Sequence, residues 1–204
     1  MSALLVFHVF AGSVALVSAG AALVLKKGGQ LHRRAGRAFF YSMVVIFLTA
    51  VVMAMQTSNT FLFLVALFSF YLAFSGWRFA RNQSGEPQWM DWLAVIIMVS
   101  SGLLMWFLAF QDFPQFNDTS VTLSVFGFIA LVLGFADARC HRDRAATGNI
   151  RIAKHLTNML GGTIAVVTAV LVVNVSMTPP WLGWILPTIL MLPVIIWWRR
   201  KVKA

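Results

Sequence analysis

Apolar residues are gathered into long, almost uninterrupted blocks along this chain, and polar residues occupy the short segments between the blocks. Seven blocks come close to the roughly 20 residues that a helix needs to cross the hydrocarbon core of a membrane. They cover residues 3–25, 38–55, 60–77, 92–110, 120–136, 156–175 and 181–198. The pattern predicts an all-α, polytopic membrane protein in which residues 1–204 form a single bundle of seven transmembrane helices.

The basic residues give these helices a direction. All 16 Lys and Arg residues lie in four segments, 26–37, 78–91, 137–154 and the tail from residue 199, whereas the other three connections carry none. Lys and Arg near the end of an apolar segment keep that end on the cytoplasmic side. The distribution therefore predicts an outer N-terminus, a cytoplasmic C-terminus and a multi-pass protein of the bacterial inner (plasma) membrane.

Composition narrows the possible partners. The chain is 60% hydrophobic and 11% charged, with a formal net charge of +10. Nucleic-acid binding is not expected, because the cations sit in short clusters at helix ends rather than on a soluble face. We expect them to meet anionic lipids at the cytoplasmic face, and a larger membrane complex is a further possible partner. The single cysteine, Cys140, excludes an internal disulfide.

The first helix carries small residues at helical spacing, namely Ala11, Gly12, Ala15 and Ala19. Small residues allow helix backbones to approach each other in lipid, so this face is predicted to pack against a neighbour. His8 lies one turn earlier on the same face. Its imidazole is therefore expected to point into the bundle near the outer surface, where it becomes a candidate for binding a cofactor.

Several polar side chains are expected at the cytoplasmic edge. His155 and Asn158 share one face at the start of the sixth helix, while His32 lies in the first basic loop at a similar depth. Asp91 opens the fourth helix, Asp137 closes the fifth, and His141 is placed in the loop that follows. These groups predict a polar cluster of His, Asp and Arg side chains on the cytoplasmic side.

This cluster allows three kinds of bound group. A divalent metal would take His32, His155, Asp137 and Asp91, because imidazole and carboxylate are its common ligands. One haem b would take His32 and His155 as axial ligands from two helices. A quinone headgroup would be held by hydrogen bonds from histidine and Asn158. The sequence leaves these alternatives open.

Both ends of the chain resemble a family of uncharacterised bacterial multi-pass membrane proteins, the type known as domain of unknown function 2306. The opening match is a membrane histidine followed by a basic His-Arg turn, at His8, Gly12, Ala15, Gly28, His32, Arg33 and Gly36. The closing match lies at His155, Met159, Thr168, Ala169, Val172, Val173, Asn174, Pro179, Pro180, Leu186, Pro187, Thr188, Trp198 and Arg199. The resemblance implies fold and location, and it implies no activity.

No catalytic motif is present in the sequence. It lacks a Gly-x-Ser-x-Gly elbow, a His-Glu-x-x-His zinc motif and a glycine-rich phosphate loop. We therefore expect a membrane protein that binds a small ligand, a lipid or a membrane-complex partner through the cytoplasmic His, Asp and Arg cluster. The alternatives are an electron-transfer module with one haem b or a quinone, and a metal-dependent membrane hydrolase.

Overall fold

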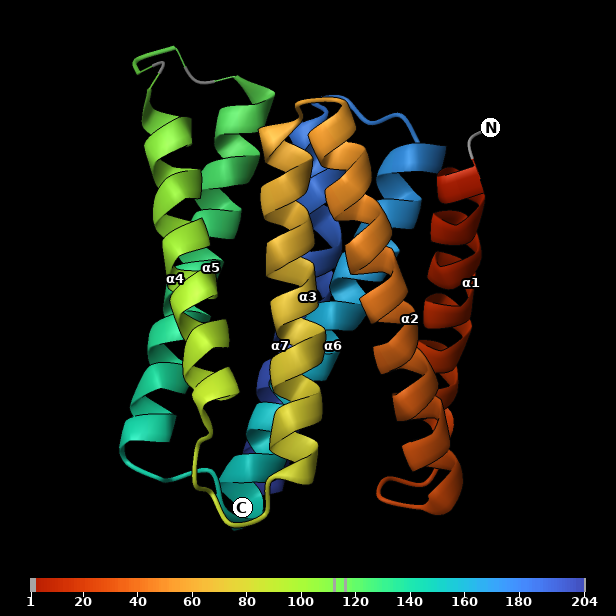
Figure 1. The fold of residues 1–204 in the computed structure, drawn as a ribbon, viewed down its shortest axis with the longest axis vertical. Helices are drawn as coiled ribbons and strands as arrows, with labels where there is room; N and C mark the ends of the chain where they lie inside the picture. The colour runs from red at the N-terminus through yellow and green to blue at the C-terminus, as the bar shows by residue number, and fades with distance from the viewer. Residues whose placement is uncertain (1–2, 112, 116, 204) are drawn as a thin grey trace.

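Seven antiparallel α-helices make up the computed structural model, which describes residues 3–111, 113–115 and 117–203. The helices are α1 (Ala3–Val24), α2 (Gln30–Gln56), α3 (Thr60–Arg81), α4 (Trp89–Phe110), α5 (Asp118–Arg142), α6 (Gly148–Asn174) and α7 (Trp181–Lys203). Each is long and apolar enough to span a membrane. The predicted all-α, polytopic architecture is therefore confirmed. Helix α1 begins at one end of the bundle and α7 finishes at the other (Figure 1).

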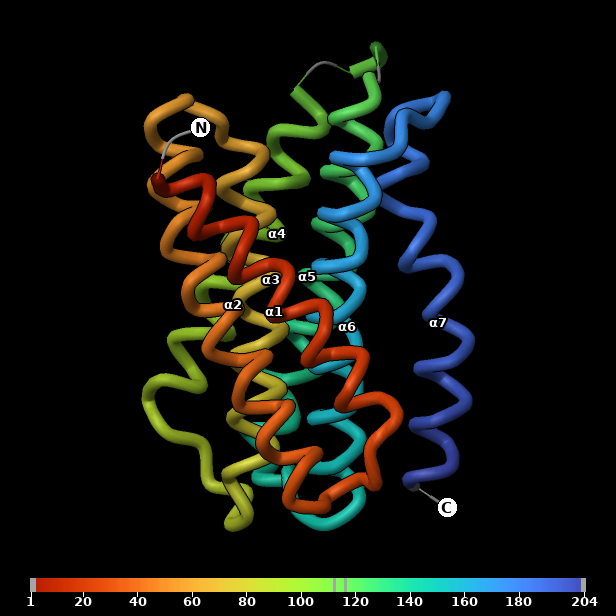
Figure 2. The backbone as a smooth tube through the Cα atoms, turned by 90° about the vertical axis from the view of Figure 1, so that its right-hand side faces the viewer, coloured from red at the N-terminus to blue at the C-terminus, as the bar shows by residue number. Residues whose placement is uncertain are grey.

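Helices α3 and α6 pack against each other in the middle of the bundle. The α1–α2 hairpin lies on one side of this pair and the α4–α5 hairpin on the other, as Figure 1 shows. Helix α7 packs against α6 and α5 from outside (Figure 2). The end of α3 and the start of α6 are thus enclosed by both hairpins.

Small residues set the closest helix approaches. A Cβ atom added at Gly127 in α5 would lie 2.6 Å from Trp106 Cδ1 and 3.0 Å from the Gly102 carbonyl oxygen in α4, so neither glycine has room for a side chain there. In α1, Ala15 and Ala19 are buried against Phe39 and other residues of α2, α3 and α6. Without water between helices, this close contact is what holds them together. The predicted packing face of the first helix is present.

Several helices extend further than the apolar blocks. Helix α2 begins at Gln30 rather than residue 38, α6 at Gly148 rather than 156, and α5 continues to Arg142 rather than 136. Hydropathy detects only the part of a helix inside the hydrocarbon, whereas backbone hydrogen bonds can continue the helix into the headgroup layer. The prediction of His32 and His141 as loop residues was consequently wrong, because both lie in helices.

The segments that carry Lys and Arg all lie at the end of the bundle where α7 finishes, which we call the basic end (lower end in Figure 1). Three cations lie over indole rings there: Arg81 over Trp77 at 4.9 Å, Lys27 over Trp198 at 5.0 Å, and Lys201 over Trp197 at 4.3 Å. Indole rings and basic side chains favour the membrane interface.

Candidate functional site

Asp137 is the centre of a buried polar junction at the basic end. Its Oδ1 atom accepts a hydrogen bond from Lys154 Nζ at 2.6 Å, and its Oδ2 atom accepts from the Tyr71 hydroxyl at 2.8 Å and from Asn158 Nδ2 at 3.3 Å. The donors come from α3 and α6, whereas Asp137 lies in α5. One carboxylate therefore joins three helices.

Burial makes this junction energetically important. Asp137 is 1% exposed, and the Lys154 side chain is 18% exposed. A carboxylate taken out of water is tolerated only if it is paired and hydrogen-bonded. Lys154 supplies the opposite charge, and Tyr71 and Asn158 supply the additional donors. Asn158 Oδ1 is fully buried and has no partner among the residues that the structure describes, so the junction retains one unused acceptor.

A second ion pair joins α3 to α4. Arg78 donates from Nε to Asp91 Oδ1 at 2.6 Å and from Nη2 to Asp91 Oδ2 at 2.8 Å. The Gln88 backbone N–H also donates to Asp91 Oδ2, at 2.8 Å. Asp91 thus caps the start of α4 and neutralises the partly buried Arg78 in the two-pronged geometry that guanidinium favours.

His141 lies between these two ion pairs. It is 6% exposed, its ring stacks on Phe79 with centroids 5.3 Å apart, and Trp92 lies 6.0 Å away. His141 Nδ1 is buried, and no residue in the described part of the chain forms a hydrogen bond with it. The seven residues of this region, which we call the basic-end polar cluster, are Tyr71, Arg78, Asp91, Asp137, His141, Lys154 and Asn158.

The other three histidines lie outside this cluster. His155 Nδ1 bonds the Gly76 carbonyl of α3 at 2.8 Å, and His32 Nδ1 bonds the Ala22 carbonyl of α1 at 3.0 Å. His8 Nδ1 lies 2.8 Å from Thr49 Oγ1, near the opposite end of the bundle from His32 and His155. His32 and His155 both lie at the basic end, as the sequence predicted, and both are partly buried.

The four proposed metal ligands do not come together. Asp137 and Asp91 are occupied by Lys154 and Arg78, whereas His32 and His155 bind backbone carbonyls of other helices. Within residues 3–111, 113–115 and 117–203, no group of three His, Cys, Asp or Glu side chains could hold a metal ion. The predicted polar cluster exists, but it is built from ion pairs.

A polar pocket of about 440 Å³ opens beside the Arg78–Asp91 pair. Its lining comes from the end of α3 and the following connection: Arg78, Arg81, Asn82, Gln83, Ser84, Glu86, Pro87 and Gln88. The connection is held by its own hydrogen bonds, from Asn82 Nδ2 to the Glu86 carbonyl at 2.7 Å and from Ser84 Oγ to Asn82 Oδ1 at 2.9 Å. The pocket walls are therefore preorganised.

The connection that forms this pocket also packs against the α5–α6 connection. Gly85 has a φ of +77°, and a Cβ atom there would lie 2.7 Å from Thr147 Cγ2 and 3.0 Å from the Arg144 carbonyl oxygen. Only glycine suits both this backbone conformation and this close approach. The α3–α4 connection is consequently packed tightly against the α5–α6 connection.

Sequence reasoning selected Asp91, Asp137 and Asn158 but missed three of their partners, Tyr71, Arg78 and Lys154. A signal for Lys154 was available, because it precedes Asn158 by one helical turn and both therefore share a face. Tyr71 gave none, since it lies 66 residues from Asp137 inside an apolar block. Comparison with protein-family models, with curated proteins and with solved structures finds no match to this chain.

Proposed function

We propose that this protein binds an anionic phospholipid headgroup at its basic end, in the pocket formed by α3 and the α3–α4 connection. The proposal rests on whether each of the two arginines that line the pocket, Arg78 and Arg81, is paired with a carboxylate. Arg78 is neutralised by Asp91. Arg81 has no carboxylate partner within the part of the chain that the structure describes, and its positive charge is available to a ligand.

The position of Arg81 favours a lipid phosphate. Its guanidinium lies over Trp77, and the Trp77 ring stacks on Phe40 of α2 with centroids 4.6 Å apart. This stack holds the guanidinium at the depth where indole rings meet headgroups. Arginine binds phosphate oxygens through two parallel N–H groups. A volume of about 440 Å³ falls within the roughly 300–1,000 Å³ of small-ligand sites.

The polar residues that line the pocket also suit a lipid headgroup. Asn82, Gln83, Ser84 and Gln88 offer amide and hydroxyl groups that suit the hydroxyls of a glycerol or similar headgroup. Glu86 at the rim is 3.6 Å from Arg144, so its negative charge is partly balanced. The basic-end polar cluster supports this site by fixing the end of α3 through the Arg78–Asp91 pair. The proposed location of the pocket is the cytoplasmic leaflet of a bacterial inner membrane.

The test is a lipid titration of the purified protein in detergent, read as the shift in unfolding temperature. Phosphatidylglycerol should stabilise the wild type more than phosphatidylcholine does, and Arg81→Gln should weaken apparent binding about tenfold, as expected for the loss of a charge-assisted hydrogen bond. Arg142→Gln is the matched control, because Arg142 is an exposed cation at the same end that pairs with Asp143.

Two results would contradict this function. The first is an equal shift in unfolding temperature of Arg81→Gln and Arg142→Gln on adding phosphatidylglycerol. That result would mean that the lipid responds only to general surface charge. The second is a stabilisation by inorganic phosphate that matches the stabilisation by phosphatidylglycerol, which would make the ligand a free anion rather than a lipid.

A further inference from the structure

Aromatic residues follow one face of α3 and lead to Arg81. Intervals of four, three and four residues, which keep side chains on one face of a helix, separate Phe70, Phe74, Trp77 and Arg81. The Phe70 and Phe74 ring centroids lie 6.1 Å apart, and the Arg81 guanidinium lies 4.9 Å from the Trp77 ring centroid. We call the rings of Phe70, Phe74 and Trp77 the aromatic stripe.

Helix α2 holds two rings of the aromatic stripe in place. Phe47 stacks on Phe70 with centroids 4.4 Å apart, and Phe40 stacks on Trp77 with centroids 4.6 Å apart. Stacked aromatic pairs stabilise a structure beyond the burial of their area. The stripe is therefore a fixed surface, and little side-chain freedom would be lost when a ligand binds to it.

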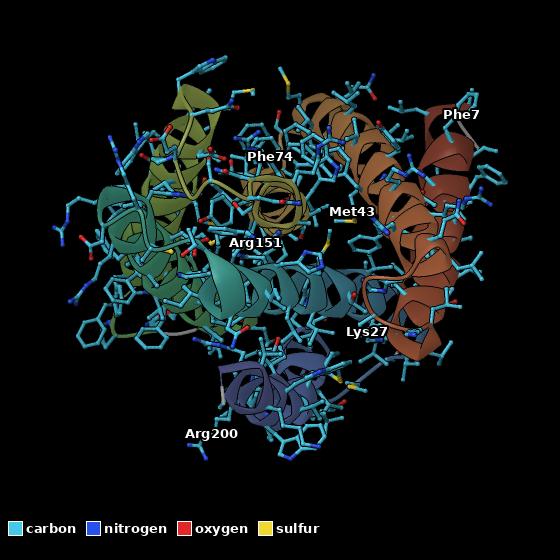
Figure 3. All side chains as sticks on the ribbon, turned by 90° about the horizontal axis from the view of Figure 1, so that it is seen from below. Phe7, Lys27, Met43, Phe74, Arg151 and Arg200 are labelled. Atoms are coloured by element: carbon cyan, nitrogen blue, oxygen red, sulfur yellow. The ribbon has the colours of Figure 1, made fainter. Side chains whose placement is uncertain are left out.

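The aromatic stripe is open to the surroundings of the bundle. Helices α2 and α4 both pack against α3, but they make no contact with each other in the described part of the chain. In the view from the basic end, Phe74 lies on the side of α3 between α4 and α2 (Figure 3). Its side chain is partly exposed, like those of Phe70 and Trp77. In a membrane, this face of α3 meets hydrocarbon.

The length of the stripe matches one lipid chain. Phe70 precedes Arg81 by 11 residues, which at about 1.5 Å per residue is roughly 16 Å along the helix axis. The hydrocarbon core of a bilayer is about 30 Å thick, so each leaflet contributes about 15 Å. A lipid chain whose headgroup lies at Arg81 would pass the whole stripe on its way to the bilayer centre.

We infer that the aromatic stripe binds one acyl chain of the same phospholipid whose phosphate lies at Arg81. This inference rests on the proposed function, which places an anionic headgroup in the pocket that Arg81 lines. The stripe is continuous with that pocket through the contact between Trp77 and Arg81, and α3 has no charged residue before Arg78. The ligand is therefore a membrane lipid with long chains, and a water-soluble phosphate ester would fill only part of the site.

The test compares phosphatidylglycerols that share a headgroup and differ in chain length. Dihexanoyl and dioleoyl phosphatidylglycerol are titrated into the full-length protein in detergent, at equal mole fractions in the micelle, and binding is read from the shift in unfolding temperature. Phe74 lies about 10 Å along the helix from Arg81, and the short chains of the dihexanoyl lipid end before it. The wild type should bind the dioleoyl lipid about fivefold more tightly, because more apolar surface is buried.

Substitutions separate the chain from the headgroup. Phe74→Ala should weaken binding of the dioleoyl lipid about fivefold and leave binding of the dihexanoyl lipid unchanged. Phe74→Leu keeps an apolar side chain without the ring, so its affinity should lie between those of the wild type and Phe74→Ala. Arg81→Gln should weaken binding of both lipids by a similar factor, because both carry the phosphate.

Phe135→Ala is the matched control. Phe135 is 59% exposed, and it precedes the last residue of α5 by seven positions, as Phe74 precedes the last residue of α3. The two rings therefore lie at a similar distance from the basic end. Phe135→Ala should leave the affinity for both lipids unchanged.

The inference is overturned if the wild type binds the two lipids equally tightly, and this comparison needs no variant. It is also overturned if Phe74→Ala and Phe135→Ala change binding of the dioleoyl lipid to the same extent; should Phe74→Ala fail to fold, Phe74→Leu takes its place in this comparison. Headgroup preference is measured separately against phosphatidylcholine. An absent preference for phosphatidylglycerol contradicts the proposed function, whereas an absent dependence on chain length contradicts only this inference.

Discussion

Replacing Asp137 by asparagine should destabilise the protein more than any comparable change of a surface carboxylate. The wild-type carboxylate accepts from Lys154, Tyr71 and Asn158 on its two oxygens. The amide of asparagine has one oxygen and places an N–H₂ group where the other oxygen was. Tyr71 and Asn158 can each turn an oxygen toward that N–H₂ group, but Lys154 can only donate, and its charge loses its partner.

The size of the effect follows from burial. A hydrogen bond to a charged group contributes about 1.5–3 kcal/mol, and removing one member of a fully buried ion pair costs about 3–5 kcal/mol. The Lys154 side chain is 18% exposed, so it can turn partly toward water and recover some hydration. We therefore expect Asp137→Asn to lower the free energy of unfolding by about 2–4 kcal/mol.

The measurement is equilibrium unfolding in mixed detergent micelles, followed by tryptophan fluorescence. Asp143→Asn is the matched control, because Asp143 is 45% exposed and its pairs with Arg139 and Arg142 are open to water. Its expected effect is below about 1 kcal/mol. If Asp137→Asn and Asp143→Asn lowered the free energy of unfolding equally, Asp137 would not contribute through a buried junction.

A double-mutant cycle with Lys154→Met separates the pair from the rest of the junction. Once Asp137 is asparagine, removing the lysine charge should cost less than it does in the wild type, with a coupling of about 1–3 kcal/mol. A coupling below about 0.5 kcal/mol would show that Lys154 does not interact with Asp137 in the folded protein.

Two further predictions concern packing and sidedness. Ala15→Leu should lower the free energy of unfolding by about 1–3 kcal/mol, because Ala15 is 0% exposed and has no room for a larger side chain. Val17→Leu is the control, because Val17 is 73% exposed. An unchanged unfolding curve for Ala15→Leu would contradict close packing of α1. In a Cys140→Ser background, Ser84→Cys should resist a membrane-impermeant thiol reagent in intact cells while Ser176→Cys reacts; the reverse pattern would invert the expected orientation. Cys140 itself is buried and a poor reporter.

The candidate site was only partly predictable from the sequence. Asp91, Asp137, His155 and Asn158 were selected because polar groups near a membrane edge stand out against an apolar background. Their roles were not visible, since a carboxylate that ligates metal and one that pairs with lysine have the same local sequence signal. His141 was misplaced because α5 continues six residues beyond its apolar block, which turns the side chain from an expected loop position into a buried one.

The sequence alone determined that the chain has seven segments able to cross a membrane, and that the segments rich in Lys and Arg lie on one side of them. Both properties are sums of local transfer free energies and need no knowledge of contacts. The tertiary structure decided which polar groups meet. Tyr71 reaches Asp137, and His155 reaches Gly76, only through the rotation and tilt of helices that are distant in the chain. Those angles result from the packing of many side chains at once, so no local pattern records them.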